Sequence, residues 1–115
     1  MSVGEATVPA LVWCPFPEAD SAAEVATTLL DEELIACANI LPAMRSLYVW
    51  RGERSDEAEV GVLFKTNRAK LDRLTIRLTG LHPYDEPAIL AWDCDHAAPH
   101  TAAWLERLGL GGLGA

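Results

Sequence analysis

The sequence comprises 115 residues, half of them apolar and 23% charged, and its 17 acidic residues outnumber nine basic ones, giving a formal net charge of −8. This length and apolar content allow one domain with a buried core, which excludes an intrinsically disordered chain. The acidic excess argues against nucleic acid or a membrane surface as partner, because both attract clusters of Lys and Arg.

The location expected from the sequence is the cytoplasm. No segment approaches the roughly 18 consecutive apolar residues of a membrane-spanning helix, and the first five residues lack the features of a secretory signal. Three cysteines with no CxxC pair fit a reducing compartment better than a disulfide scaffold.

The first half of the chain predicts two strands around a helix. Residues 6–14 are apolar and precede two prolines, which is typical of a strand. Ser21 has the spacing of a helix-capping box, so we expect an amphipathic helix over 21–33. Residues 34–41 predict a second strand that continues over 45–51, with a bulge or a sheet edge at the intervening proline.

A long hairpin and a second helix follow. We expect a polar turn at 52–56 and a third strand over 58–65, where apolar and polar residues alternate. Asn67 is placed to cap a helix whose leucines recur at helical spacing until Pro83 ends it.

A fourth strand over 88–94 and a short helix over 99–108 complete the predicted order β-α-β-β-α-β-α. This is the α+β, ferredoxin-like split β-α-β plan, an antiparallel four-stranded sheet with both main helices on one face. We expect one domain over 1–115 with flexible ends at about 1–5 and 109–115. The uncovered sheet face predicts a homo-oligomer, and Trp13, Trp50, Trp92 and Trp104 supply large aromatic surface for it.

Four separated motifs resemble the CutA family of divalent-cation tolerance proteins. They are ACANILP at 36–42, SLYVWRG at 46–52, Lys65-Thr66, and His82-Pro83-Tyr84 with Pro87. The resemblance extends from about Cys14 to Leu108. It implies a ferredoxin-like homotrimer that binds divalent metal, copper foremost, in the metal-ion response, with no established reaction. We therefore expect no enzyme.

The resemblance also implies metal ligands. Cys14 and His82 match a Cys and a His of the family, and thiolate with imidazole selects copper or zinc over harder ions. Cys14 ends the first strand, so we expect its thiol to be reachable. The alternatives are a buried cysteine that acts as a small hydrophobe and a histidine that caps the second helix.

By the same resemblance, five residues are candidates for lining a cleft between subunits: Cys37, Tyr48, Trp50, Lys65 and Tyr84. The alternative for them is core or interface packing. The family's trimer resembles that of the PII signalling proteins, which suggests the alternative function, a regulatory module binding a small ligand or protein partner in such clefts. Two departures weaken the metal hypothesis: Leu81 replaces the second histidine of some members, and Ala88 replaces the usual Glu.

A second possible metal site is local to this chain. Residues 93–96 (Asp-Cys-Asp-His) and His100 place carboxylates, a thiol and two imidazoles in a short segment, although a solvated acidic turn is the simpler interpretation. Cys14 and His82 could also form a nucleophile and base, but the sequence has no local catalytic signature around them.

Overall fold

The computed structural model describes residues 7–110, so the flexible ends expected at about 1–5 and 109–115 fall outside it except for residues 109 and 110. In chain order the elements are β1 (Pro9–Phe16), α1 (Ala19–Asp31), β2 (Cys37–Trp50), β3 (Glu53–Asn67), the 3-10 turn η1 (Arg68–Lys70), α2 (Leu71–Leu81), β4 (Leu90–Asp93) and α3 (Pro99–Glu106). No helix of this part of the chain is long and apolar enough to span a membrane.

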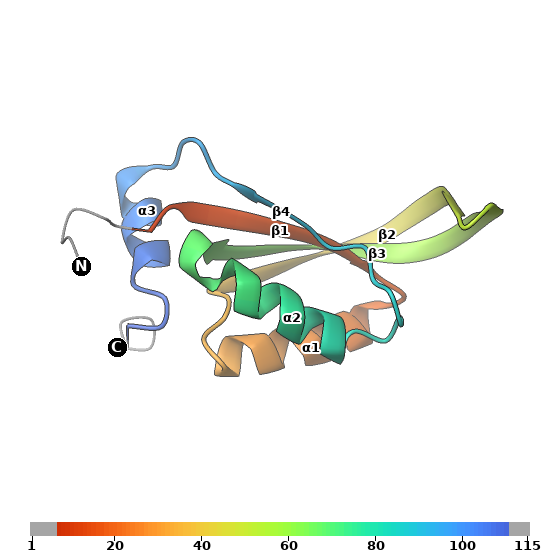
Figure 1. Cartoon of the computed structure of the whole chain (residues 1–115), viewed down its shortest axis with the longest axis horizontal. Coiled ribbons are helices and arrows are strands. Elements are labelled where there is room, and N and C mark those ends of the chain that lie inside the picture. The colour runs from red at the N-terminus through yellow and green to blue at the C-terminus, as the bar shows by residue number, and fades with distance from the viewer. Residues whose placement is uncertain (1–6, 111–115) are drawn as a thin grey trace.

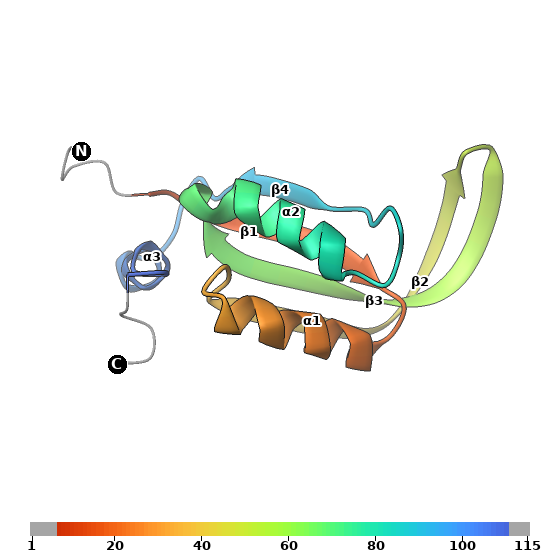
Figure 2. The same ribbon diagram turned by 60° about the horizontal axis from the view of Figure 1, so that its bottom comes forward.

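The four strands form one antiparallel sheet in the order β2-β3-β1-β4. Helices α1 and α2 cover one face of it, and α3 lies at one end (Figures 1 and 2). This arrangement confirms the predicted α+β, ferredoxin-like fold.

The core lies between the sheet and the two long helices. Along β1 every second side chain is buried, because successive residues of a strand point to opposite faces. Val12, Cys14 and Phe16 pack in this way with Leu29 of α1 and Leu74 of α2. Burying such a side chain contributes about 1.5–3 kcal/mol.

Both predicted side-chain caps are wrong. Helix α1 begins at Ala19, two residues earlier than expected, and the Ser21 hydroxyl donates to the Glu18 carbonyl (3.0 Å) instead of accepting a backbone N–H. Asn67 precedes η1 without capping it, and its Nδ2 donates to the carbonyl oxygen of Leu105 (2.8 Å). Asn67 therefore makes a hydrogen bond to a residue 38 positions away and not the local cap that the sequence pattern predicts.

The hairpin of β2 and β3 projects beyond the helices as an arm, and the molecule is 49 Å long and about half as wide (Figure 2). The expected turn at 52–56 is wrong, because the strands continue to Trp50 and Glu53 and only Arg51 and Gly52 connect them. Both have positive φ, +50° and +82°, as two-residue type I′ turns require. The bulge predicted near the proline lies between Leu41 and Met44.

Within residues 7–110, no helix covers the sheet face opposite α1 and α2 (Figure 1). The strand register places Trp13 of β1 beside Leu90 of β4, and Leu11 beside Trp92. A side chain at position 61 would collide with the Trp13 ring, so Gly61 allows that ring to lie against β3. Apolar surface therefore remains exposed on this face, including 46% of Trp92.

Candidate functional site

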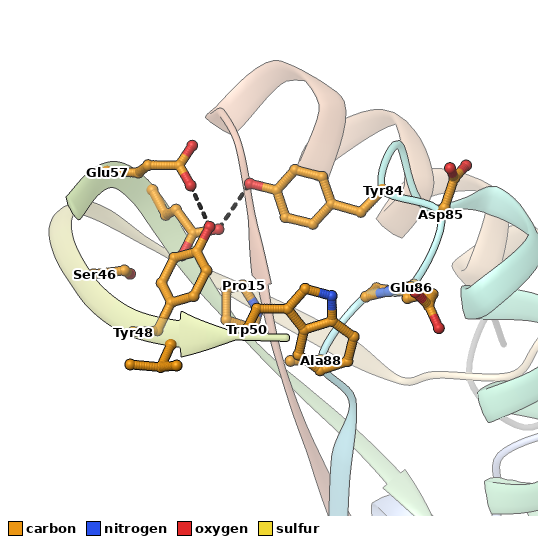
Figure 3. A pocket seen from close by; sticks show the side chains of 12 residues that line it. Pro15, Ser46, Tyr48, Trp50, Glu57, Tyr84, Asp85, Glu86 and Ala88 are labelled. Atoms are coloured by element: carbon orange, nitrogen blue, oxygen red, sulfur yellow. Dashed lines mark hydrogen bonds between the residues drawn. The ribbon is translucent and has the colours of Figure 1, made fainter. Parts of the chain in front are cut away.

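A pocket of about 620 Å³ lies between the β2–β3 arm and the loop that joins α2 to β4. Tyr48 and Trp50 of β2 face Tyr84 of the loop across it, and Pro15 at the end of β1 lies between them (Figure 3). Its volume is within the range of small-molecule sites, roughly 300–1,000 Å³.

Carboxylates line the same pocket: Glu57 and Glu59 of β3, and Asp85 and Glu86 of the loop. Two of these carboxylates accept hydrogen bonds from tyrosines that line the pocket (Figure 3). The hydroxyl of Tyr84 donates to Oε2 of Glu59 (2.7 Å), and that of Tyr48 donates to Glu57. Burial, followed by the contact with Glu59, raises the pKa of Tyr84, so this hydroxyl stays protonated and keeps donating.

A cationic side chain lies at the pocket's edge. One guanidinium nitrogen of Arg51 is 2.6 and 2.8 Å from the two carboxylate oxygens of Glu86. The same guanidinium lies 5.5 Å from the centre of the Trp50 ring, within the range of a cation–π contact. Arg51 thereby links the arm to the α2–β4 loop.

His82 lies directly behind the pocket, with both ring nitrogens engaged. Its Nε2 is 2.8 Å from the carbonyl oxygen of Pro15, and its Nδ1 accepts from the backbone N–H of Tyr84 (3.0 Å). This pattern requires the neutral ring with its proton on Nε2. Burial lowers the pKa of His82, which favours the same neutral form. The side chain therefore links the start of the α2–β4 loop to β1 and does not bond the last carbonyls of α2.

Cys14 is fully buried in the core, so the expectation of a reachable thiol is wrong. Its Sγ is 3.6 Å from the carbonyl oxygen of Pro15, the atom that His82 also contacts. The two residues that the family resemblance selected as metal ligands therefore lie close together. Burial, with a smaller effect from Glu59, raises the pKa of the Cys14 thiol to about 12, so it is protonated near neutral pH.

Within residues 7–110, no three His, Cys, Asp or Glu side chains are grouped so that they could hold a metal ion. In the segment proposed from sequence as a second site, two side chains already have hydrogen-bond partners. The carboxylate of Asp93 pairs with Arg68 (2.6 Å), and the thiol of Cys94 donates to the backbone carbonyl of His96 (3.2 Å).

The family was established by comparison with known proteins. The sequence profile of the CutA1 divalent ion tolerance proteins matches residues 10–107. This chain belongs to the CutA family. The divalent-cation tolerance protein CutA of Pyrococcus horikoshii is 42% identical over 83% of this chain and 92% of its own length, and that of Thermococcus kodakarensis is 36% identical over 88% and 96%.

Solved CutA structures share the fold. CutA1 of Ehrlichia chaffeensis superposes with a TM-score of 0.83 at 30% identity, over 89% of this chain and 95% of that one. CutA1 of Oryza sativa has a TM-score of 0.78 at 31% identity, over 92% and 95%. Both the resemblance inferred from the motifs and the ferredoxin-like fold are confirmed.

Of the five cleft candidates in this CutA chain, the structure brings three into the pocket, Tyr48, Trp50 and Tyr84. Cys37 and Lys65 are instead directly opposite each other in the β2–β3 ladder, and neither lines the pocket.

Sequence reasoning missed Glu57, Glu59 and Arg51. The spacing of Glu57 and Glu59 could have revealed them, since residues two apart in a strand share a face. Placing the turn at 52–56 hid the start of that strand.

Proposed function

We propose that this CutA-family chain forms a cytoplasmic homotrimer that binds divalent metal, copper foremost, in the response to metal ions. The observation that carries the proposal is the match to divalent-cation tolerance proteins over residues 10–107. All three cysteines are free, which fits a reducing compartment. A structural relative from Archaeoglobus fulgidus, 23% identical, is named periplasmic, and that name applies to the other protein.

Surface composition supports assembly. Leu47, Val49 and Trp50 on the arm are 68%, 64% and 53% exposed, and Leu90 on β4 is 64% exposed. Monomeric soluble proteins rarely expose contiguous apolar surface of more than a few hundred Å². Strands β2 and β4 are also the edges of the sheet, where unpaired backbone groups can pair with another chain. Further copies of this chain fit both features, and three is the number that the family resemblance implies.

The metal ligands we propose are Cys14 and His82, which both contact the carbonyl of Pro15. A metal ion must displace the thiol proton of Cys14 and free one ring nitrogen of His82. Because that thiol has a pKa of about 12, protons compete strongly for it near neutral pH. We therefore expect copper affinity to rise with pH.

Equilibrium dialysis against copper tests this assignment. The variant Cys14→Ser/His82→Ala should bind fewer copper ions per chain than the wild type. The matched control Cys94→Ser/His96→Ala, which removes the same two groups from the 93–96 segment, should bind as many as the wild type. Equal binding by wild type and Cys14→Ser/His82→Ala, with circular dichroism showing both folded, would contradict the site.

The state of Cys14 argues against a role as catalytic nucleophile. A cysteine nucleophile attacks as the thiolate and has a lowered pKa in an accessible, electropositive setting. Cys14 has the opposite properties, because its pKa is raised and its side chain is fully buried.

The second candidate function is a PII-like module that binds a small ligand or partner. It is favoured by the pocket between the arm and the α2–β4 loop, whose walls are aromatic and whose volume suits a small molecule.

A further inference from the structure

We infer that this pocket binds an organic cation, a protonated or quaternary amine that carries an apolar body. The inference rests on the second candidate function and specifies its ligand. It follows from the charge of the pocket wall, from one carboxylate oxygen that the protein leaves without a partner, and from the aromatic surfaces beside it.

The charge of the wall selects a cation. Of the 12 lining residues, four are acidic and none is Lys, Arg or His. The guanidinium of Arg51 at the pocket's edge is paired with Glu86, and no salt bridge among the described residues gives Glu57, Glu59 or Asp85 a basic partner. A nucleotide or another phosphate ester would meet uncompensated like charge in this pocket.

Glu59 supplies the principal contact. Its side chain lies in the pocket wall and the residue is only 7% exposed. Oε2 accepts from Tyr84, and Oε1 has no hydrogen-bond partner within residues 7–110. No fully buried side-chain oxygen in this range lacks a hydrogen-bond partner, so Oε1 keeps some solvent exposure, on a side chain that lines the pocket. An N–H donor from an amine, or the charge of a quaternary nitrogen, satisfies a buried carboxylate in this position.

The aromatic walls suit the rest of such a ligand. Tyr48, Trp50 and Tyr84 surround the space beside the two glutamates (Figure 3). Ring faces attract ammonium groups and pack against alkyl or aryl carbon. The Trp50 ring already accepts a cation at the pocket's edge, because the Arg51 guanidinium lies over it. Arg51 is therefore a competitor at the pocket's edge, and a ligand's cation has to share or replace its contact with Trp50.

A bare metal ion fits this pocket less well than an amine. Divalent metals require several ligand atoms at fixed distances, and the described carboxylates are not grouped for that. Glu57 and Glu59 are each hydrogen-bonded to a tyrosine hydroxyl. An organic cation needs only one carboxylate and a ring face.

Isothermal titration calorimetry of the assembled protein with benzyltrimethylammonium tests the inference, with benzyl alcohol as the neutral probe and ATP as the anionic probe. We expect saturable binding of the cation and none of the other two. Glu59→Gln, which keeps the side-chain shape, should weaken binding roughly tenfold, the usual effect of losing a contact to a charged group. Arg51→Gln should strengthen binding because it removes the competing cation.

Two further variants complete the experiment. Trp50→Leu should also weaken binding. Because Trp50 also belongs to the exposed surface proposed for assembly, native mass spectrometry of this variant must show as many chains as in the wild type. Glu24→Gln removes a carboxylate from the outer surface of α1 and should bind the cation like the wild type.

Binding of ATP in place of the cation, or equal affinity in the wild type, Glu59→Gln and Trp50→Leu, would overturn the inference. Failure here is distinguishable from failure of the metal proposal. Copper binding measured by dialysis depends on Cys14 and His82, whereas binding of the amine depends on Glu59 and Trp50.

Discussion

At the scale of single residues, the site is organised by polar side chains that the fold has enclosed. His82 is 7% exposed, and the centre of its ring lies 4.1 Å from the centre of the Phe16 ring. Both of its ring nitrogens are hydrogen-bonded. From the sequence it could be recognised as a functional candidate at a helix end. Its contact with the Pro15 carbonyl could not be predicted, because that contact joins residues 67 positions apart.

The lowered pKa of His82 gives the first prediction at this scale. The unfolded chain takes up the proton near the ordinary pKa of about 6.5, before the folded chain does, so stability decreases as pH falls below that value. Each unit by which the fold lowers the pKa corresponds to about 1.4 kcal/mol at low pH.

Urea unfolding between about pH 7 and pH 5 measures this effect. The wild type should lose more stability over this range than His82→Gln, while His96→Gln, altered at an exposed histidine, should follow the wild type. If the free energy of unfolding has the same pH dependence in the wild type and in His82→Gln, the buried ring does not contribute to the pH dependence of stability.

At the scale of elements, apolar runs and periodicity located the four strands and three α-helices of the described residues but not the 3-10 turn η1, and the errors occurred where local patterns competed with distant contacts. β1 was predictable as an apolar run next to two prolines, although the strand continues through Pro15 to Phe16. The long hairpin was also predicted, but the start of β3 was not, because the outer part of that strand is exposed on both faces and its polar residues resemble a turn. The expected turn at 52–56 came from that ambiguity.

Asn67 connects the end of β3 to α3, a contact that the sequence patterns did not predict. Its side chain is 2% exposed and donates to the Leu105 carbonyl near the end of α3. Asn67→Ala leaves that carbonyl without its partner and should cost about 1–3 kcal/mol of unfolding free energy. Hydrogen exchange should quicken in α3 before it does in β1. The surface variant Asn39→Ala should change neither, and unchanged exchange in Asn67→Ala would rule out the anchoring role.

At the scale of the whole molecule, a sheet covered on one side and a projecting arm leave apolar surface exposed, as the sequence predicted from its one-sided topology. Of the four tryptophans expected to contribute, Trp50 and Trp92 are exposed, whereas Trp13 and Trp104 are half-buried. The pocket was only partly predictable. Tyr48, Trp50 and Tyr84 were found by resemblance, but the glutamates join them only because the arm curves toward the α2–β4 loop (Figure 2). Such curvature has no signature in a local pattern of residues.

Native mass spectrometry with limiting copper tests the central claim most directly, because one spectrum reports both the number of chains and the metal bound. We predict a species of three times the 12.5 kDa chain mass that carries copper in the wild type and loses it in Cys14→Ser/His82→Ala. A copper-free species at 12.5 kDa under the same conditions would contradict the proposed trimer and its metal binding alike.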